Sequence, residues 1–310
     1  MSVSLEQASI DYVAMRRSFG YKLHGHDRLL TDFCAYLTRA GLNSVTVETA
    51  AAWAVAPGRS DAWHSERLTV VRGFAAYLRG LDHFSEIPPR NVIGHRRRRV
   101  PPHIYTHDEI KALMAQAGEM VPPLRAATFQ TLIGLLAVTG MRSGEALRLN
   151  RGDVDLTTGT IAILATKFNK SRTVVAHPTT REALTGYASL RDQRWPIRHD
   201  TAFFVSNSGA RLSPSSLYAG FGQLLERTGL TPPANARRRR PRPHDLRHSF
   251  AVATLLGWYR NDRDVAALLP SLSAWLGHAQ PKDTYWYLSA VPELLAAASE
   301  RAQQRRTHPR

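Results

Sequence analysis

The chain has 310 residues, of which 43% are hydrophobic, and a formal net charge of +16 at pH 7. At roughly 100–200 residues per domain this length suggests two domains, and the apolar fraction is enough for ordinary globular cores, which excludes a wholly disordered chain. The longest apolar stretch, residues 131–138, is far shorter than the ~20 residues that a bilayer helix needs, and the single cysteine, Cys34, excludes an internal disulfide bond.

Residues 1–87 are predicted to form a small helical domain. Two sets of apolar residues recur at the spacing of an amphipathic helix. They are Leu29, Leu30, Phe33 and Leu37, and Leu68, Val71, Ala75 and Leu78. Basic residues such as Arg16 and Arg17 alternate with aromatic residues such as Tyr12 and Phe19. This pattern fits a surface that grips a phosphate backbone and fits an ordinary solvated basic face equally well.

Residues 88–104 are predicted to be a basic linker. The stretch is rich in proline and arginine and contains no acidic residue. Proline cannot continue a helix and favours extended geometry in the residue before it. We therefore expect this segment to separate the N-terminal domain from a second domain at residues 105–310.

The second domain is predicted to be mainly helical with a small β-sheet. Helices are expected from about residue 106 and over residues 122–138. Residues 160–164 and 173–175 have strand character and flank a polar turn, which favours a β-hairpin. Helical periodicity returns near residue 178 and continues to about 298, interrupted by the arginine-rich residues 234–243. The fold class expected for the whole chain is therefore mostly α with a small sheet.

The positive charge is the first functional clue. The isoelectric point of the sequence is about 10.7, which favours a polyanionic partner, with nucleic acid ahead of an anionic membrane. A protein that is merely basic and soluble is the alternative. The arginines are concentrated in two clusters, one in the linker and one near the C-terminal third. These clusters are Arg96, Arg97, Arg98 and Arg99, and Arg237, Arg238, Arg239 and Arg240.

The segment PHDLRHSF, residues 243–250, carries several chemically active side chains. Proline is well tolerated where a helix begins, so we expect a helix on which His244, Arg247 and His248 share one face. An arginine fork beside imidazoles that carry protons is typical of a phosphate site. A metal site with His244, Asp245 and His248 is a second interpretation, disfavoured because Arg247 would repel a cation. A solvated helix start is a third.

Three further segments contain candidate residues. Arg142 follows a glycine that would end one helix and lies at the positive start of the next, with Glu145 placed to hold it. Lys167 lies at the tip of the predicted hairpin. His278 follows another helix-ending glycine, nine residues before Tyr287. Each segment alone has an ordinary explanation as a surface or core feature.

Taken together, these segments resemble the catalytic domain of the tyrosine recombinases, the phage-type integrases. The resemblance covers the C-terminal two-thirds of the chain and rests on TGMRSGEAL, TKFNKSR, HDLRH, LGH and the tyrosine that follows. The residues that it marks as catalytic are Arg142, Lys167, His244, Arg247, His278 and Tyr287. The N-terminal helices resemble the core-binding domain of the family, and YVAMRRSFGYKL and DTYWYLSA are most similar to recombinases of mobile elements.

The resemblance implies that Tyr287 attacks a backbone phosphate, forms a 3′-phosphotyrosyl bond and releases a 5′-hydroxyl. A second strand then reverses the step without ATP. A phenol has a reference pKa near 10, so only about one in a thousand is ionised at pH 7. The guanidinium groups of Arg142 and Arg247 would stabilise the negative charge that builds on the phosphate.

The resemblance also implies roles for the remaining residues. His244 would act as base towards Tyr287, and Lys167 would protonate the leaving 5′-oxygen. His278 would donate a further hydrogen bond, and His248 would buttress the site. No metal or other cofactor is expected, because arginines would neutralise the charge for which nucleases use Mg²⁺.

The implied partner is double-stranded DNA, with both arginine clusters along its phosphates. The resemblance also implies a homo-tetramer, or a mixed tetramer with related recombinases, on DNA. The segment after about Val291 would dock on a neighbour or on its own domain. The first twelve residues contain no basic or apolar run of an export signal, so we expect a cytoplasmic protein with no membrane partner.

One departure from the family pattern concerns spacing, and two alternative functions stay open. Residues 258–271 lengthen the segment between Arg247 and His278, and this bears on the choice of Tyr287 over Tyr285 as nucleophile. A catalytically silent DNA-binding partner of another recombinase is one alternative, disfavoured by the intact set of six residues. A DNA-relaxing enzyme with the same chemistry is the other.

Overall fold

The computed structural model describes residues 4–21, 23, 25–55, 60–81, 84–93, 101–164, 171–196, 200–232, 239–278, 280, 282–290, 293–296 and 298–300. Several predicted site residues lie outside this part of the chain: Lys167, Arg96, Arg97, Arg98, Arg99, Arg237 and Arg238. None of the helices in the described part combines the length and the apolar character that a membrane span requires. The chain separates into two compact units, Met1–Arg99 and Val100–Arg310.

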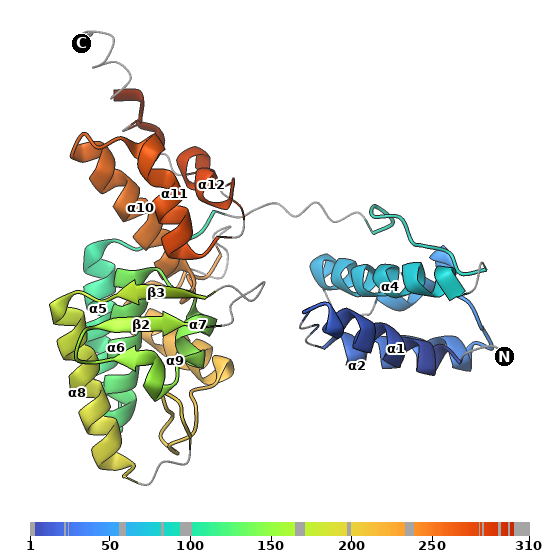
Figure 1. Cartoon of the computed structure of the whole chain (residues 1–310), viewed down its shortest axis with the longest axis horizontal. Helices are drawn as coiled ribbons and strands as arrows, with labels where there is room; N and C mark the ends of the chain where they lie inside the picture. The colour runs from blue at the N-terminus through green and yellow to red at the C-terminus, as the bar shows by residue number, and fades with distance from the viewer. Residues whose placement is uncertain are drawn as a thin grey trace. The chain divides into compact units, whose positions relative to one another are not determined.

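The described part of the N-terminal unit is a bundle of helices. These are α1 (Leu5–Ser18), α2 (His26–Arg39), α3 (Val47–Ala54) and α4 (Asp61–Leu81) (Figure 1). They share one apolar core, in which Phe33 of α2 and Phe74 of α4 are completely buried. Arg72 of α4 donates hydrogen bonds to the carbonyls of Pro88 and Pro89, so the first residues of the predicted linker contact this unit.

The C-terminal unit is mainly helical and contains a small sheet. Its described elements, in chain order, are α5 (His107–Gly118), α6 (Pro123–Thr139), α7 (Ser143–Arg148), the short 3-10 helix η1 (Arg151–Asp153), β1 (Val154–Asp155), β2 (Thr160–Ile163), β3 (Arg172–Val175), α8 (Pro178–Arg194), α9 (Pro214–Arg227), α10 (Asp245–Arg260), α11 (Val265–Leu276) and α12 (Lys282–Ala290). The predicted fold class, mostly α with a small sheet, is confirmed.

The sheet is antiparallel, with strand order β1-β2-β3. Ile161 of β2 lies opposite Val154 on one side and Val174 on the other, and all three side chains are buried. Val175, the next residue along β3, is exposed, as expected where one face of a sheet packs on a core. The predicted hairpin strands are confirmed to within one residue at their ends.

The prediction of helical periodicity from residue 178 to about 298, interrupted by the second arginine cluster, is wrong for residues 200–213. Phe203, Phe204 and Val205 are buried in an extended segment that makes isolated β-bridges, and Gly209 turns the chain with a φ of 81°. A short apolar run of this kind fits a buried strand and a buried helix equally well, so periodicity alone does not distinguish them.

Helix α6 is the central element of the C-terminal unit. Its sequence is apolar on nearly every side, and Leu132 and Ile133 are completely buried. Such an all-round apolar helix belongs inside a core, and α6 contacts α5, α7, α8, α9 and α10. Its last turn therefore lies at a point where several elements meet.

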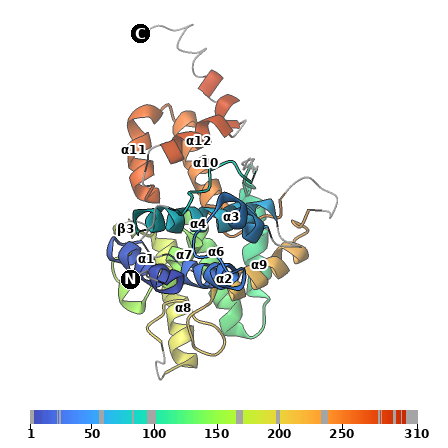
Figure 2. The ribbon, with the colours of Figure 1, turned by 90° about the vertical axis from the view of Figure 1, so that its right-hand side faces the viewer.

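Helices α10, α11 and α12 lie together at one end of the C-terminal unit, beyond the sheet (Figures 1 and 2). They share a second apolar core, to which Leu255 of α10, Leu272 of α11 and Tyr287 of α12 contribute buried side chains. The additional segment 258–271 forms the end of α10 and the first half of α11. It thus builds part of the wall against which α12 packs.

Candidate active site

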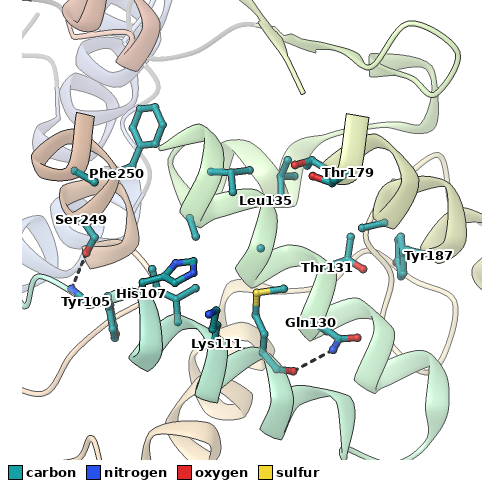
Figure 3. Close-up of a pocket in the computed structure, with 18 of the residues that line it drawn as sticks. Tyr105, His107, Lys111, Gln130, Thr131, Leu135, Thr179, Tyr187, Ser249 and Phe250 are labelled. Atoms are coloured by element: carbon teal, nitrogen blue, oxygen red, sulfur yellow. Dashed lines mark hydrogen bonds between the residues drawn. The ribbon is translucent and has the colours of Figure 1, made fainter. Parts of the chain in front are cut away.

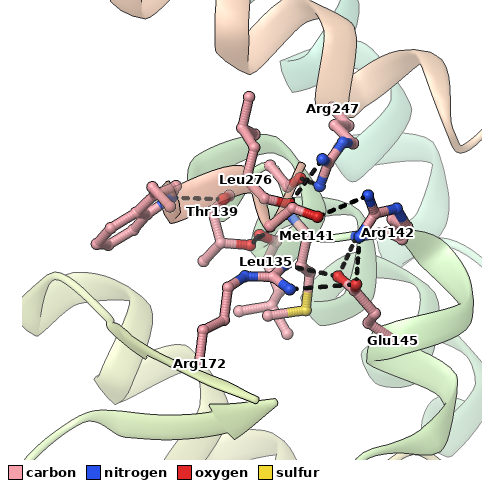
Figure 4. A network of polar contacts seen from close by, with 11 residues as sticks. Leu135, Thr139, Met141, Arg142, Glu145, Arg172, Arg247 and Leu276 are labelled. Atoms are coloured by element: carbon pink, nitrogen blue, oxygen red, sulfur yellow. Dashed lines mark hydrogen bonds and ion pairs between the residues drawn. The ribbon is translucent and has the colours of Figure 1, made fainter. Parts of the chain in front are cut away.

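The first part of the site is the junction between α6 and α7. Gly140 ends α6 in the left-handed conformation, with a φ of 62°. Arg142 then caps α7, and its Nη1 donates to Glu145 Oε1 at 2.7 Å while its Nη2 donates to the carbonyl of Gly277 at 3.0 Å (Figure 4). The Arg142 side chain is 32% exposed and that of Glu145 only 1%, so the guanidinium keeps an open side.

Strand β3 brings another arginine to this junction. Arg172 donates from Nη2 to Glu145 Oε2 at 2.7 Å and from Nη1 to Oε1 at 3.2 Å. Burial by itself raises the pKa of Glu145, but the hydrogen bonds and charges of Arg172 and Arg142 outweigh it and lower the pKa to about 2. The sequence interpretation gave Arg172 no role, although it lies within the quoted motif TKFNKSR.

Arg247 joins two helix ends from the first turn of α10. Its Nη1 donates to the carbonyl of Gly140 at 2.9 Å and its Nη2 to the carbonyl of Leu276 at 2.6 Å. The last carbonyls of a helix have no partner inside the helix and carry partial negative charge, which a guanidinium complements. Burial first, and then the charge of Arg142, lower the pKa of Arg247 to about 10, so the group stays cationic at neutral pH.

Arg142 and Arg247 therefore meet at two neighbouring peptide groups. The carbonyls of Leu276 and Gly277, which accept their hydrogen bonds, are consecutive in the chain and directly precede His278. Figure 4 shows both guanidinium groups on this turn, with the Glu145 carboxylate beneath them. The two predicted arginines, 105 residues apart in sequence, are brought together by the C-terminal ends of α6 and α11.

Histidines line the other side of this cluster. His244 caps the start of α10, His248 lies one turn later, and their rings are 5.2 Å apart, edge to face. His278 Nδ1 lies 2.7 Å from Thr284 Oγ1. Burial first, and then the charges of nearby arginines, lower the pKa of His244 to about 4. Burial first, then His244 and then the nearby arginines lower the pKa of His248 to about 3.

The same causes lower the pKa of His278 to about 4. Burial is again the largest, and the charges of Arg247 and Arg142 add to it, while Asp283 opposes them. The histidines of the cluster are therefore neutral at pH 7. A neutral imidazole has one nitrogen with a lone pair and one that carries a proton.

Tyr287 of α12 lies inside the cluster. Its side chain is 2% exposed, and its ring lies parallel to that of His278, 6.5 Å away. His248 Nδ1 is 2.8 Å from the Tyr287 hydroxyl. Tyr285, the other candidate, is 51% exposed. Of the two tyrosines, the structure brings Tyr287 to the predicted arginines and histidines.

The two described members of the second arginine cluster contact acidic residues of the same chain. Arg239 donates to Asp245 at 2.8 Å, and Arg240 donates to Glu226 at 2.7 Å. Asp245 is completely buried and also accepts from the backbone N–H of Arg242. Its carboxylate is thus directed to arginines, which disfavours the alternative of a metal site built from the HDLRH segment. Among the described residues, no three His, Cys, Asp or Glu side chains are grouped to hold a metal ion.

A cavity of about 950 Å³ lies elsewhere, between α5, α6, α8 and α10 (Figure 3). Its lining is largely apolar with a few polar groups, among them His107, Lys111 and Gln130. The predicted site residues are absent from the described residues that line it. The arginine and histidine cluster is therefore recognised by its chemistry and not by a large cavity.

The cluster combines cationic guanidinium groups, neutral imidazoles and a phenol on a mainly helical scaffold. Guanidinium groups bind phosphate with paired hydrogen bonds, and a phenol beside them is a potential nucleophile for phosphorus. The site therefore has the composition of one that binds a phosphodiester and attacks it with a side chain.

Comparison with known proteins identifies the family. Residues 104–293 match the phage integrase family. The protein y4rB of Sinorhizobium fredii (strain NBRC 101917 / NGR234), named as an integrase/recombinase, is 38% identical over 309 residues, which cover 97% of this chain and 98% of that protein. The chain belongs to the phage integrase family of tyrosine recombinases, and the predicted family and enzyme class are confirmed at that level.

Solved structures share the fold. The XerH site-specific recombinase bound to palindromic difH substrate is 22% identical, with a TM-score of 0.64 over 96% of this chain and 84% of that one. A chain of the lambda integrase tetramer bound to a Holliday junction is 19% identical, with a TM-score of 0.57 over 90% of this chain and 79% of that one.

Proposed function

We propose that this protein cuts and rejoins double-stranded DNA at specific sites through a 3′-phosphotyrosyl intermediate, with Tyr287 as the nucleophile. The observation that carries the proposal is the buried Tyr287 phenol in a cluster with the histidines, next to the turn on which Arg142 and Arg247 meet. The DNA partners named for XerH and lambda integrase support the choice of substrate.

Arg142 and Arg247 have donors left for a phosphate. A guanidinium has five N–H donors, and within the described residues each side chain uses two of its nitrogens, on a carbonyl or on Glu145. The remaining N–H groups would hold the non-bridging oxygens as negative charge builds on them. Because such donors are positioned before the reaction, removing one typically lowers the rate by ~10²–10³.

Lys167 is proposed as the acid that protonates the leaving 5′-oxygen. The residue lies outside the described part of the chain, between β2 and β3. Arg172, the first residue of β3, contacts Glu145 at the centre of the cluster. The separation of five residues from Arg172 would allow Lys167 to reach the same phosphate.

The arginine clusters and the assembly state are part of the same proposal. Arg96, Arg97, Arg98 and Arg99, and Arg237, Arg238, Arg239 and Arg240, would lie along DNA phosphates. Arg239 and Arg240 would then exchange their present acidic partners for phosphates, or keep them and order the segment before α10. We propose a tetramer on DNA, as named for lambda integrase, with residues 1–87 and 105–310 as the two DNA-contacting domains.

A nicked suicide substrate tests the chemistry. After cleavage the short fragment that carries the new 5′-hydroxyl diffuses away, so the strands cannot be rejoined. The protein therefore stays attached to the DNA and is detected as a slower band on a denaturing gel. We expect the adduct with the wild-type protein in EDTA. Tyr287→Phe should abolish it while DNA binding stays intact, and Tyr285→Phe is the matched control that should retain it. Loss of the adduct in Tyr285→Phe instead, or a strict requirement for Mg²⁺, would contradict the proposal.

A further inference from the structure

The hydrogen bond between His248 and Tyr287 joins two rigid elements. His248 is held by α10 and Tyr287 by α12, and the nitrogen and the hydroxyl oxygen are 2.8 Å apart. Trp286 packs edge-on against both rings, with ring centres 5.9 Å from His248 and 5.4 Å from Tyr287. The contact is therefore fixed by packing from both helices.

Arg142, Arg247 and His278 each make a hydrogen bond to a group other than the phenol. Arg142 and Arg247 donate to carbonyls. His278 lies face to face with the Tyr287 ring, and its Nδ1 contacts Thr284. His244, the base expected from the sequence, makes no hydrogen bond through its ring with any residue in the described ranges. His248 Nδ1, 2.8 Å from the phenol oxygen, is in position to accept the phenol proton.

The protonation state of His248 suits that role. The groups that face it are His244 and Arg247 on α10, Arg239 and Arg242 in the segment before it, and Tyr287 on α12. After burial, the positive charges among them lower the pKa of His248 to about 3, so the imidazole is neutral at pH 7. In the tautomer that carries its proton on Nε2, Nδ1 presents a lone pair to the phenol.

We propose that His248 holds the Tyr287 hydroxyl and accepts its proton as the phenol oxygen attacks phosphorus; this inference rests on the function proposed above. The bond from phosphorus to the tyrosine oxygen forms, and the bond from phosphorus to the 5′-oxygen breaks. The phenol proton moves to His248 Nδ1, and the 5′-oxygen leaves with the bonding pair and takes a proton from a separate acid, proposed to be Lys167. In the reverse step His248 returns the proton to the tyrosine.

DNA binding would strengthen this base. A phosphodiester adds negative charge beside Arg142 and Arg247 and so cancels part of the repulsion that keeps His248 neutral. The imidazolium becomes easier to form once the substrate is in place. His244, whose ring nitrogens are not used by other described residues, is then available to contact a phosphate oxygen.

The test compares His248→Asn with His244→Asn in single-turnover cleavage of the nicked substrate. The asparagine amide retains polar atoms near the position of Nδ1 but is not a base. We expect His248→Asn to lower the rate of adduct formation by ~10²–10⁴, the range for a lost general base. Its rate should then rise about tenfold per pH unit between pH 7 and 9, because the phenol must ionise unaided. The wild-type protein and His244→Asn should show no such rise.

A substrate with a sulfur atom in place of the bridging 5′-oxygen distinguishes the loss of the general base from the loss of the general acid. A thiolate leaves without being protonated, so the sulfur substrate should restore Lys167→Ala and should leave His248→Asn slow. Replacing Tyr287 by a fluorotyrosine lowers the pKa of the phenol, and this should rescue His248→Asn more than the wild-type protein. DNA binding by His248→Asn at the wild-type level shows that the variant is folded, and His248→Gln provides a second variant.

The outcomes distinguish a failure of the role proposed for His248 from a failure of the proposed function on which it rests. If the wild-type protein forms no adduct, or Tyr287→Phe retains it, the proposed function itself fails. If Tyr287→Phe abolishes the adduct but His248→Asn cleaves at or above the wild-type rate, His248 is not the base. The inference is also overturned if the steep pH dependence appears in His244→Asn.

Discussion

Glu145 is the carboxylate that organises the cations of the site. It accepts hydrogen bonds from Arg142 and Arg172, and both arginines lie close to the turn at Gly277. Its pKa of about 2 means that it keeps its charge at any pH at which the protein is used. Without that charge, two guanidinium groups would face each other with no counter-ion between them among the described residues.

We predict that Glu145→Gln destabilises the protein by about 3 kcal/mol, the lower end for removing one partner of a buried ion pair. The amide also places an N–H group against an arginine. Urea unfolding measures the loss. Glu119→Gln is the matched control: Glu119 is exposed at the end of α5, and we expect a change within about 0.5 kcal/mol. Equal effects of the two substitutions would show that Glu145 has no special part in the cluster.

The buried histidines predict how stability depends on pH. In the folded protein the pKa values of His244, His248 and His278 are about 4, 3 and 4, whereas an unfolded histidine has a pKa near 6.5. Below pH 6.5 the unfolded chain therefore binds protons that the folded chain does not. Stability should be fully present above that pH and fall as the pH drops towards 4, by about 1.4 kcal/mol per pH unit for each proton.

Urea unfolding at pH 7.5, 6.5, 5.5 and 5.0 checks this dependence. His278→Gln removes one of the three groups and should flatten the decline by the amount due to one proton. His278 is suitable because its contact with Thr284 is a single side-chain hydrogen bond at the edge of the cluster. An unfolding free energy that stays constant from pH 7.5 to 5.0 would show that these histidines are not buried in the neutral form.

At the residue scale, the sequence identified the residue types of the candidate site and their spacing, but not which side chains contact one another. Arg142 and Arg247 could be recognised from the sequence, because a glycine and a proline mark the helix ends beside them. The contact of Tyr287 with His248 could not be predicted from the sequence, because it depends on how α12 packs on α10 and on which rotamer each ring adopts. Arg172 was missed because an arginine that begins a strand has no local signal that sets it apart.

At the scale of elements, the site is built from helix ends. The C-terminal end of α6 offers the carbonyl of Gly140, and that of α11 offers the carbonyls of Leu276 and Gly277. Each end carries partial negative charge, so both helix ends stabilise the Arg247 guanidinium and the end of α11 also stabilises that of Arg142. Because the carbonyls belong to tightly packed helices, the guanidinium groups are positioned before any phosphate arrives.

Gly140→Ala should disrupt this junction. A Cβ at residue 140 would lie 2.4 Å from Phe250 Cδ1 and 3.0 Å from Leu276 Cδ2, and the φ of 62° is unfavourable for alanine. We predict a loss of at least 1–3 kcal/mol in urea unfolding and a lower yield of the covalent adduct. Gly186→Ala is the control: it lies within α8 with no heavy atom within 4 Å of the new Cβ. It should stabilise the helix by about 0.5–1 kcal/mol. If Gly140→Ala leaves the free energy of unfolding unchanged, α6 and α10 can move apart without loss of stability.

The ends of the helices were easier to predict from the sequence than the structure of the segment at residues 200–213. The helix expected from about residue 106 and the glycines at 140 and 277 mark helix ends that the structure has at those residues or next to them. Residues 200–213 were misassigned because their apolar run has the composition of a helix core, while their shape is set by packing of Phe203 and Phe204 on Tyr187. Such packing is non-local and leaves no period in the sequence.

At the scale of the whole molecule, the net positive charge is much larger than the arginines of the candidate active site can account for. The net charge of +16 is spread over both compact units, and some of the arginines form internal ion pairs, as Arg239 and Arg240 do. Those pairs reduce the number of charges available for phosphates without changing the total. The number of phosphates neutralised is therefore a property to measure and cannot be counted from the sequence.

The dependence of DNA binding on salt measures that number. If six to ten phosphates are neutralised, the affinity for duplex DNA should fall by ~10³–10⁵ between 50 and 200 mM salt, because each contact releases condensed counter-ions. Fluorescence anisotropy with a labelled duplex gives the slope. Tyr287→Phe is the matched control, since it removes the proposed nucleophile but no charge, and its slope should equal that of the wild-type protein. A fall of less than tenfold would mean that fewer than about two phosphates are contacted, and the arginine clusters would then serve the fold instead of DNA.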